Sequence, residues 1–581
     1  MIKTFLKSIR EFKIPTILTL IFIIGEVFIE VLIPFRTAAL VNGVQAGMPM
    51  NELLKLGLVL VGMSILSLCF GGSAAVLGSK AAAGFARNVR GDVFRRIQGF
   101  SFENIDKFST ASLVTRLTTD VGYVRMAFMM TIRAAVRSPL MFIFSIIMAW
   151  RMGGSLALTF VVVVPVLIAG LLLIARKAMP AFRAVFKKYD RMNESVEENV
   201  RGMRVVKGFA REDYEKEKFG KASRNIAKDF TRAERIVALN NPLMTLCINF
   251  NLVFILWVGA KLIITSHGAL INVGEISAMI TYGMQILMSL MMFSMIYVMM
   301  TMSWESMKRI AEVLSEEPSL KNPAEPLTEV ADGSLDFENV SFKYSRTAQN
   351  DSLSAVDLHI PSGSTVGILG GTGSGKSTLV QLIPRLYDAT EGSVRVGGRD
   401  VREYDIKTLR NAVSMVLQKN LLFSGTIRDN LRWGNENATD EELEEACRLA
   451  QADEFIRSFP DGYDTHIEQG GTNVSGGQKQ RLCIARALLK KPKILILDDS
   501  TSAVDTRTDA KIRAGFKAYI PETTKIIIAQ RVASVEDADL ILVMDGGRIA
   551  AQGTHEELMR TSDIYREIYE QQTKGGDSDE E

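Results

Sequence analysis

The stretch of sequence that decides the fold of this chain reads Gly370-Gly371-Thr372-Gly373-Ser374-Gly375-Lys376-Ser377. It matches G-x-x-x-x-G-K-[ST] at every fixed position, and the apolar run Val366-Gly367-Ile368-Leu369 precedes it. A buried strand, a loop of this kind and a helical pattern in succession predict a phosphate-binding loop in an α/β domain. The glycines let backbone N–H groups turn toward phosphate oxygens. We expect Lys376 to reach the β- and γ-phosphates, Ser377 to bind Mg²⁺ and Thr378 to contact the nucleotide.

A second acidic element and a second glycine-rich turn follow the phosphate loop. The run Ile494-Leu495-Ile496-Leu497 reads as a buried parallel strand, and Asp498 at its end is placed to hold Mg²⁺. Upstream of it, the turn Ser475-Gly476-Gly477-Gln478 opens an apolar helical stretch and forms another phosphate cradle. One nucleotide does not need two cradles. We therefore expect the second cradle to serve a nucleotide held by another copy or a partner chain.

The N-terminal half has the hydropathy of a membrane domain. A spanning helix needs about 20 mostly apolar residues. Six segments satisfy this criterion, namely residues 14–40, 54–79, 134–152, 155–176, 242–264 and 275–300. The third and fourth segments are separated only by Arg151-Met152-Gly153-Gly154, which predicts a very tight external turn.

The overall composition agrees with a membrane half joined to a soluble half. The chain has 581 residues, and its mean hydropathy is positive although 23% of the residues are charged. A net charge of +3 is too small to indicate nucleic-acid binding. The cysteines Cys69, Cys247, Cys447 and Cys483 lie far apart, which argues against a disulfide framework or a zinc site.

Basic residues indicate the orientation of the spans. The long segments 80–133 and 177–238 are rich in Lys and Arg, whereas the connections 41–53, 151–154 and 265–274 hold almost none. Basic loops remain cytoplasmic, so we expect a multi-pass protein of the cell membrane with both termini and the soluble domain inside. The two long segments contain few Gly or Pro residues and are expected to continue the membrane helices into the cytosol.

The domain boundaries follow from these patterns. Three prolines, Pro318, Pro323 and Pro326, interrupt the helical pattern after the last span, and the final residues are polar and acidic. We expect a membrane domain at 1–310, a linker at 311–334, an ATP-binding domain at 335–572 and a disordered acidic tail at 573–581.

The soluble domain resembles the nucleotide-binding domain of ABC transporters. Over nearly its full length, the chain resembles a half-transporter of the six-helix exporter type. The resemblance implies an ATP-driven translocase that works as a dimer with ATP and Mg²⁺. It also gives roles to single residues: Tyr344 matches the aromatic that stacks on adenine, and Gln418 matches the glutamine that touches Mg²⁺ and faces the membrane domain. The four residues from Ser475 to Gln478 match the signature motif, and Ser502-Ala503-Val504-Asp505 matches the D-loop.

Two cytoplasmic stretches also resemble this family. Residues 108–120 are similar to the first intracellular loop of these exporters, and residues 193–198 with 205–209 are similar to the second. The resemblance implies short helices near 107–115 and 209–216 that dock on nucleotide-binding domains and transmit their closure.

Two positions depart from the family pattern. Asp499 stands where the family usually has the glutamate that polarises the attacking water, and Gln530 stands where it has a histidine on the γ-phosphate. The aspartate side chain is one methylene shorter, and a displacement of about 1 Å can cost about 10²-fold in rate. Glutamine cannot become cationic, so it stabilises developing phosphate charge less well. Both changes affect hydrolysis and leave the binding motifs intact.

This pattern resembles the degenerate half of a heterodimeric multidrug ABC exporter. The signature is near consensus apart from Val474, so this chain can complete a competent site on a second half-transporter. We expect the partner to carry glutamate and histidine at the matching positions and an altered signature. The expected cargo is a drug or another amphipathic small molecule, and membrane lipid is expected as a further partner. The alternatives are lipid or peptide export by a homodimer and a regulatory subunit whose ATP binding gates a partner.

Two features of the spans bear on the cargo. Glu26 and Glu30 share one helix face, where they attract cationic cargo, line a water-filled cavity or pair with Arg or Lys from a partner helix. The sixth span is rich in methionine, with Met288 and Met295 one heptad apart. Such a stripe suits a cavity for varied apolar shapes, although helix packing is its more frequent meaning.

Overall fold

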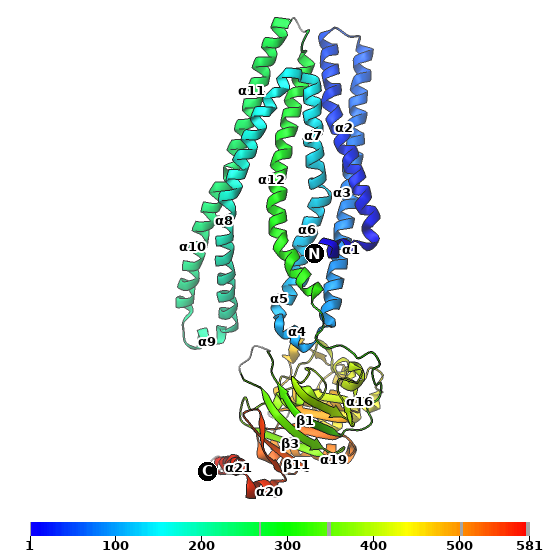
Figure 1. Ribbon diagram of the computed structural model, residues 1–581, viewed down its shortest axis with the longest axis vertical. Helices are drawn as coiled ribbons and strands as arrows, with labels where there is room; N and C mark the ends of the chain where they lie inside the picture. The colour runs from blue at the N-terminus through cyan, green and yellow to red at the C-terminus, as the bar shows by residue number, and fades with distance from the viewer. Residues whose placement is uncertain (1, 267–268, 346–349, 500–503, 577–581) are drawn as a thin grey trace. The chain divides into compact units, whose positions relative to one another are not determined.

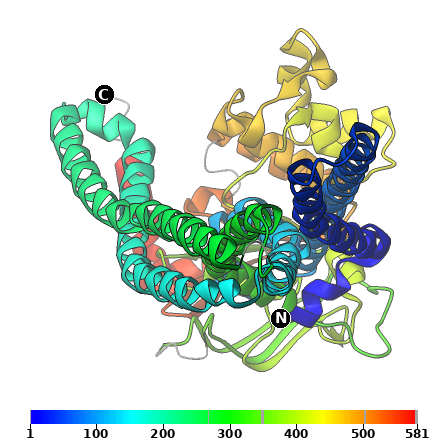
Figure 2. The same cartoon turned by 90° about the horizontal axis from the view of Figure 1, so that it is seen from above.

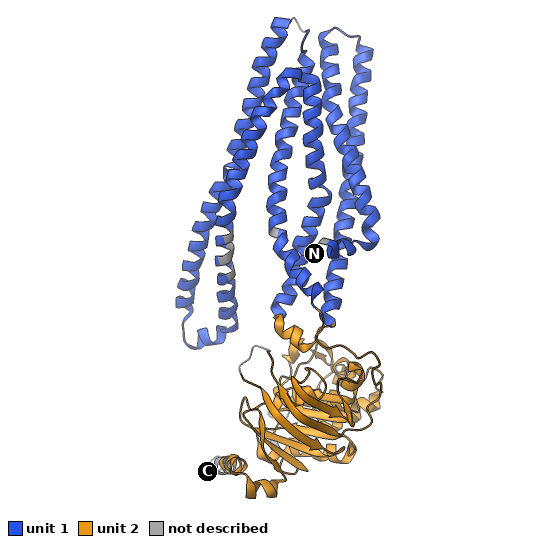
Figure 3. Ribbon diagram, viewed as in Figure 1, with its two compact units in different colours: residues 1–98, 110–316 blue, residues 99–109, 317–581 orange. Residues whose placement is uncertain are grey.

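Long helices dominate the N-terminal half of the chain (Figure 1). The computed structural model describes residues 2–266, 269–345, 350–499 and 504–576. Its two units, coloured separately in Figure 3, are described one at a time. Unit 1 comprises Met1–Gln98 and Thr110–Glu316, and unit 2 comprises Gly99–Ser109 and Glu317–Glu581.

The helices of unit 1 follow the predicted spans and extend beyond them. They are α1 (Ile2–Lys7), α2 (Lys13–Gln45), α3 (Met50–Gln98), α5 (Thr110–Thr115), α6 (Val121–Ile132), α7 (Ala134–Gly153), α8 (Thr159–Arg201), α9 (Met203–Gly208), α10 (Glu212–Ala238), α11 (Asn240–Ser266) and α12 (Val273–Ser315). Short 3₁₀ segments occupy Arg10–Phe12 and Gly154–Leu158, and a π-helical segment, Arg116–Asp120, joins α5 to α6.

Within the described residues, five helical stretches are long and apolar enough to cross a membrane. One of them, Thr110–Phe182, contains α7, the first part of α8 and the break between them, so the six predicted spans fall on six helices. The break lies at Gly154, whose φ of +49° lies in the left-handed region that glycine readily adopts. The tight turn predicted at 151–154 is therefore displaced: Arg151 to Gly153 still belong to α7, a 3₁₀ segment begins at Gly154, and α8 begins at Thr159 rather than at 155.

The predicted extensions of the membrane helices are present. α8 and α10 run beside each other and are joined by the short helix α9 (Figure 1). Phe182 meets Phe230 edge to face at 5.9 Å, and Lys188 forms an ion pair with Asp229. Seen from above, α2 and α3 lie on the opposite side of unit 1 from the α8 and α10 pair (Figure 2). The short helix expected near 209–216 is α9, at Met203–Gly208, and Glu212 already begins α10.

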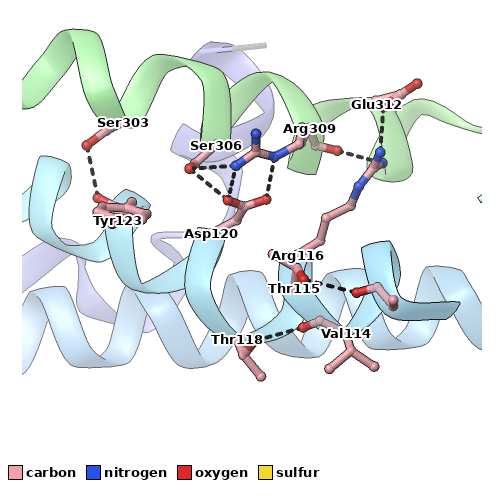
Figure 4. Close-up of polar contacts among 11 residues, drawn as sticks. Val114, Thr115, Arg116, Thr118, Asp120, Tyr123, Ser303, Ser306, Arg309 and Glu312 are labelled. Atoms are coloured by element: carbon pink, nitrogen blue, oxygen red, sulfur yellow. Dashed lines mark hydrogen bonds and ion pairs between the residues drawn. The ribbon is translucent and has the colours of Figure 1, made fainter. Parts of the chain in front are cut away.

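A buried carboxylate joins the π-helical segment to the last helix of unit 1 (Figure 4). Asp120 has no exposed side-chain surface and accepts hydrogen bonds from Arg309 Nε and Ser306 Oγ, both at 2.8 Å. On the next turn, Arg116 pairs with Glu312 at 3.0 Å and donates to the Arg309 carbonyl oxygen at 3.0 Å.

Unit 2 is built around a six-stranded sheet with the order β12-β11-β3-β10-β9-β6, in which only β12 runs antiparallel to its neighbour. The order of its other two sheets is β2-β1-β4-β5 and β7-β8. The strands are β1 (Leu335–Phe342), β2 (Leu353–Ile360), β3 (Thr365–Gly370), β4 (Glu391–Val396), β5 (Arg399–Asp400), β6 (Val413–Val416), β7 (Gly425–Thr426), β8 (His466–Ile467), β9 (Ile494–Asp498), β10 (Thr524–Ile528), β11 (Leu540–Asp545) and β12 (Arg548–Gly553).

Two hydrophobic clusters cover the two faces of the six-stranded sheet. Leu495 and Leu497 belong to one cluster, and Ile494 and Ile496 belong to the other, because successive strand residues point to opposite faces.

The helices of unit 2 that follow the first strands are α13 (Lys376–Leu382), α14 (Ile406–Ala412), α15 (Ile427–Arg432), α16 (Asp440–Leu449), α17 (Asp453–Ser458), α18 (Gly476–Leu488), α19 (Thr506–Tyr519), α20 (His555–Thr561) and α21 (Asp563–Gly576). α21 continues into the predicted tail at 573–581, and residues 577–581 lie outside the described part.

The helix α4 (Phe102–Lys107) belongs to unit 2, although the sequence placed it in the membrane domain. Phe102 meets Tyr387 edge to face at 6.0 Å, and the Tyr387 hydroxyl donates to Asp106 at 2.7 Å. Asn104 donates to the Glu317 carbonyl oxygen and accepts from the Ser319 N–H. The docked helix therefore precedes the segment 107–115 that was predicted to dock, and α5 within that segment belongs to unit 1.

Candidate nucleotide-binding site

Three buried parallel strands bring the predicted phosphate loop and acidic element to one edge of the sheet. β10 lies between β3 and β9, and Ile528 is opposite both Ile368 and Asp498. The carboxyl ends of β3 and β9 therefore present Gly370 and Asp498 at the same edge, one strand apart. This is the edge where open α/β sheets bind ligands.

The phosphate loop is packed so closely that glycine is required at two of its positions. Gly370 has a φ of +149°, and a Cβ there would lie 2.3 Å from the Met544 carbonyl oxygen. Gly375 has a φ of +95°, and its Cβ would lie 2.8 Å from the Ser352 carbonyl oxygen. The Met544 oxygen belongs to β11, and Ser352 directly precedes β2 and donates its N–H to the Phe342 carbonyl oxygen, so a side chain would push the loop away from its position.

Lys376 is the cation of the loop. Its Nζ donates to the carbonyl oxygens of Gly370 at 2.9 Å and Gly371 at 2.7 Å, so the ammonium lies over the loop. Burial lowers the pKa of Lys376, and the charges of Asp498 and Asp499 oppose that shift. A phosphate group would supply the anionic partner that this partly buried ammonium lacks among the backbone carbonyls.

Ser377 and Asp498 form the pair of oxygen donors that was predicted to hold Mg²⁺. The Ser377 hydroxyl donates to Asp498 Oδ1 at 3.2 Å, across from α13 to the end of β9. Burial raises the pKa of Asp498, the Ser377 hydrogen bond lowers it, and the nearby Asp499 charge raises it further. The carboxylate is thus costly to keep ionised without a cation nearby.

The two residues that depart from the family pattern contact each other. Gln530 Nε2 donates to Asp499 Oδ2 at 2.8 Å, and Gln418 Nε2 lies 3.4 Å from the same oxygen. Asp499 has a φ of +50°, an uncommon conformation for a residue with a side chain, and its N–H donates to the Ile528 carbonyl oxygen. Three of the residues predicted for catalysis or metal binding therefore meet at one carboxylate oxygen.

Tyr344 lies beside the loop in a cluster of aromatic side chains. Its hydroxyl donates to Gln381 Oε1 at 3.1 Å and lies 3.1 Å from the Thr378 hydroxyl. Its ring meets Phe342 and Tyr387 edge to face at 4.9 and 5.2 Å. Burial raises the pKa of Tyr344. Tyr344 as a residue remains 46% exposed and lines a cavity, which leaves surface for a planar ligand.

A cavity of about 940 Å³ connects Tyr344 with the phosphate loop. Of the predicted residues, its wall includes Tyr344, Gly373, Ser374, Gly375, Lys376, Ser377 and Thr378. Among the described residues, the trio at Asp499 lies outside this wall.

One part of the wall does not follow from the sequence motifs. Asn350, Asp351 and Ser352 directly precede β2 and Ser354 lies in it, while Gly546 and Gly547 form the turn between β11 and β12 and Arg548 begins β12. The Gly-Gly pair after an apolar run predicts a hairpin turn, but only the fold brings that turn to the loop, where Gly547 N–H donates to the Ser374 carbonyl oxygen.

The signature residues stand apart from this cavity. Ser475 caps α18: its hydroxyl accepts from the Gln478 N–H at 3.3 Å, and its own N–H donates to Gln478 Oε1 at 2.9 Å. Asp505 caps α19 by accepting from the Thr508 N–H at 2.9 Å, which holds the pKa of Asp505 below its usual range. Within the described residues, none of these lines the cavity. Ser502 and Ala503 of the predicted D-loop lie outside the described part.

Comparison with known proteins agrees with both halves of the structure. A family model described as "ABC transporter transmembrane region" matches residues 16–305, and one described as "ABC transporter" matches residues 353–502. The chain is 35% identical over 567 residues to "Uncharacterized ABC transporter ATP-binding protein YfiB" of Bacillus subtilis, covering 98% of each chain. It is 37% identical over 541 residues to "Uncharacterized ABC transporter ATP-binding protein Rv1273c" of Mycobacterium tuberculosis, covering 92% of each.

A solved structure described as "Structure of a bacterial Atm1-family ABC exporter with ATP bound" superposes on the chain with a TM-score of 0.83. The two are 25% identical, and the match covers 97% of this chain and 98% of that one. The likeness spans the membrane helices and the nucleotide-binding domain together. The chain therefore belongs to the ABC transporter family, as an ATP-driven exporter with its transmembrane and ATP-binding domains on one polypeptide.

Proposed function

We propose that this chain is one half of a heterodimeric exporter of amphipathic small molecules, in which its own site holds Mg-ATP and hydrolyses it slowly. The observation that carries this proposal is the contact between Asp499 and Gln530. Both residues depart from the family pattern at the hydrolytic step, and the 2.8 Å hydrogen bond makes them one unit. Changes that are paired in this way favour a site with altered chemistry over two unrelated substitutions.

The geometry of this pair supports slow hydrolysis. The Asp499 carboxylate accepts from an amide of Gln530 and lies within 3.4 Å of another amide, that of Gln418. An amide that donates to Oδ2 occupies a lone pair of that oxygen, so an attacking water must compete with the amide for it. Gln530 also remains neutral at any pH, so it cannot supply a positive charge to the departing phosphate.

The residues fit a bound magnesium ion. Mg²⁺ prefers hard oxygen ligands, which the Ser377 hydroxyl, the Asp498 carboxylate and the Gln418 side-chain carbonyl can supply. Among the described residues, Lys376 is the cation whose charge favours the ionised form of the buried Asp498. When bound, the ion would neutralise charge on the β- and γ-phosphates. Ser377 and Asp498 would hold it in place, while Lys376 orients the phosphates.

The signature motif, Ser475 to Gln478, supports a role for this chain at the ATP site of its partner. The Ser475 and Gln478 side chains and N–H groups cap α18, and the exposed turn is a ready anion site. Within one chain, this turn is not part of the wall around Lys376 in the described residues. We propose that it faces ATP held by the second half-transporter, where rapid hydrolysis occurs. In the membrane, the basic segments 80–133 and 177–238 and both termini face the cytoplasm.

A purified-protein comparison tests the proposal. The chain alone should hydrolyse ATP slowly, and the complex with a second half-transporter should hydrolyse it at ordinary exporter rates. The double variant Asp499→Glu/Gln530→His should raise the turnover of the chain's own site by about 10²-fold, because it restores the longer carboxylate and a group that can become cationic. Adding Lys376→Ala to this variant should remove the gain.

Ordinary exporter rates from the chain alone would contradict the proposal and indicate a homodimer. Transport that requires the partner's lysine but not Lys376 would instead favour the regulatory alternative.

A further inference from the structure

Unit 1 contains a cavity of about 670 Å³ that is separate from the nucleotide site. Its wall comes from α2, α6, α7 and α12, which pack against one another in the membrane half. The volume lies within the range of pockets that bury a drug-sized ligand. The residues of this wall indicate the chemical class of the ligand, an inference that rests on the export of amphipathic small molecules proposed above.

Methionine forms most of the apolar wall. Among the described residues, eight methionines line the cavity, and four of them, Met284, Met288, Met292 and Met295, belong to the predicted stripe of the sixth span. Met288 and Met295 are 60% and 56% exposed, so most of their surface is not buried against neighbouring helices. Flexible thioether side chains adapt to varied apolar shapes. The stripe therefore suits the apolar body of a ligand.

Arg137 pairs with both carboxylates of α2, including Glu26, which itself lines the cavity. Arg137 Nη1 donates to Glu26 at 3.0 Å, and Arg137 Nη2 donates to both oxygens of Glu30 at 2.8 and 2.7 Å. The Arg137 side chain is 41% exposed, whereas those of Glu26 and Glu30 are 10% and 25% exposed. The predicted pairing of these glutamates with a basic residue is confirmed. The more exposed member of the cluster is the cation.

A second arginine on the wall has no partner of this kind. Arg133 lies at the break between α6 and α7, and it lines the cavity. Its stem packs where Gly78 leaves room: a Cβ on Gly78 would lie 3.3 Å from Arg133 Cδ. In the part of the chain that the structure describes, the Arg133 guanidinium makes no hydrogen bond or ion pair. It interacts electrostatically with the Glu26 carboxylate.

We propose that this cavity binds amphipathic organic anions, with the acid group on the Arg133 guanidinium and the apolar body against the methionine wall. Arg137 lies one helical turn further along α7 and adds a second, partly neutralised cation. The Ser138 and Gln285 side chains beside it can donate to the remaining acid oxygens. A guanidinium in a wall of low polarity attracts an anion more strongly than one in water. A cationic ligand would be repelled by Arg133, and Arg137 already occupies Glu26 and Glu30.

The test uses one fluorophore with three head groups. The probes are 11-(dansylamino)undecanoic acid, its methyl ester and the matching trimethylammonium compound. Their binding is titrated by fluorescence on the complete transporter in phosphatidylcholine nanodiscs, with empty nanodiscs subtracted. We expect the acid to bind at least tenfold more tightly than the other two. Arg133→Gln should weaken acid binding about tenfold and leave ester binding unchanged.

Three further variants make the test specific. Arg133→Lys keeps the charge and should retain most of the acid binding. Glu26→Gln leaves Arg137 less neutralised and should tighten acid binding about threefold. Arg36→Gln is the matched control, because Arg36 belongs to α2 and lies beside Phe35 outside the cavity wall in the described residues. It should change nothing.

The source of the anion is assigned by a second arm. Phosphatidylglycerol added to the nanodiscs should compete with the acid in the unaltered protein, and not in Arg133→Gln, if the natural ligand is an anionic lipid. An absence of competition assigns the site to small amphiphiles that are not membrane lipids.

Equal binding of the three probes, or acid binding that survives Arg133→Gln, would overturn the inference. Either result would leave the export function standing. A different result would count against the export function: acid binding that is lost in Arg133→Gln, with no ATP-dependent uptake of the acid into inverted vesicles. The anion site would then be supported, and the proposed export would be contradicted.

Discussion

Asp120 Oδ2 accepts from Arg309 Nε at 2.8 Å, which ties the π-helical segment after α5 to the last turns of α12 (Figure 4). Asp120 is fully buried, whereas the Arg309 side chain is 47% exposed. Ser306 donates to the other carboxylate oxygen at 2.8 Å. π-Helical segments are often found at functional sites, and this one carries both Asp120 and Arg116.

The asymmetric burial predicts unequal effects of the two single substitutions. Arg309→Ala leaves the buried carboxylate with one hydroxyl partner and should lower the free energy of unfolding by about 2–3 kcal/mol. This is less than for a fully buried ion pair, because the arginine is half-exposed. Asp120→Ala lets Arg309 turn to water and should cost less. Adding Asp120→Ala to Arg309→Ala should recover part of the lost stability. Thermal unfolding of the detergent-purified protein measures all three. A double variant that is less stable than Arg309→Ala would refute this reading.

The C-terminal helix predicts a second effect, on the loop that contains Gln530. Gln572 Nε2 donates to the Gln530 carbonyl oxygen at 2.8 Å, and Gln572 Oε1 accepts from the Val532 N–H at 2.8 Å. Gln572→Ala removes both bonds and frees the Val532 N–H. We expect hydrogen exchange in a peptide spanning 530–535 to become about tenfold faster, since one lost hydrogen bond is worth about 1 kcal/mol or more.

Gln571 supplies the matched control for this measurement. It lies next to Gln572 on α21 and donates to Glu567 on its own helix. Gln571→Ala should leave exchange at 530–535 unchanged. Equal acceleration in both variants would mean that α21 as a whole had loosened, and would remove the specific role of Gln572.

Sequence predicted the features that depend on local chemistry. The glycines at 370 and 375 are required by backbone approach within one loop, and Asp498 follows a strand whose apolar run is unmistakable. Contacts between distant segments could not be predicted in the same way. Arg137 meets Glu26 and Glu30 across 111 and 107 residues, and hydropathy does not fix the rotation of one helix against another.

The docking helix is an intermediate case. It was expected near 107–115, from resemblance, and the structure places it at Phe102–Lys107. The sequence does carry a local signal for this start. Ser101 and Asn104 form a reciprocal capping box, since Ser101 N–H donates to Asn104 Oδ1 at 3.1 Å. Reading that cap would have moved the predicted helix to its observed position.

The docking contact itself predicts loss of coupling. Phe102→Ala removes the edge-to-face contact with Tyr387, an aromatic pair worth about 1 kcal/mol beyond its buried area. The docked population of α4 should fall, so transport per ATP hydrolysed should fall about fivefold while ATP affinity stays within twofold. Phe94→Ala, on the exposed face of α3, is the control. A parallel loss of ATP affinity and transport would indicate damage to unit 2 instead of uncoupling.

The last prediction concerns the cost of keeping Asp498 ionised. Burial raises the pKa of Asp498, so the folded apo protein binds this proton more tightly than the unfolded chain. Stability then falls as the pH rises from below the ordinary carboxyl pKa through the raised value, and at neutral pH the full penalty is present. Asp498→Asn removes the charge and should raise the apparent Tm of the apo protein by about 1–3 °C.

Three measurements check this sign. In EDTA at neutral pH, Asp498→Asn should melt above the unaltered protein, and the difference should shrink as the pH falls into the carboxyl range. With ATP and Mg²⁺, the order should reverse, because only the carboxylate can hold the ion and ligand binding stabilises the folded state. Asp545→Asn, an exposed carboxylate at the end of β11, should show neither change. A lower apo Tm for Asp498→Asn would mean that its hydrogen bond from Ser377 outweighs the desolvation of its charge, and the order with ATP and Mg²⁺ would then carry no information about a metal site.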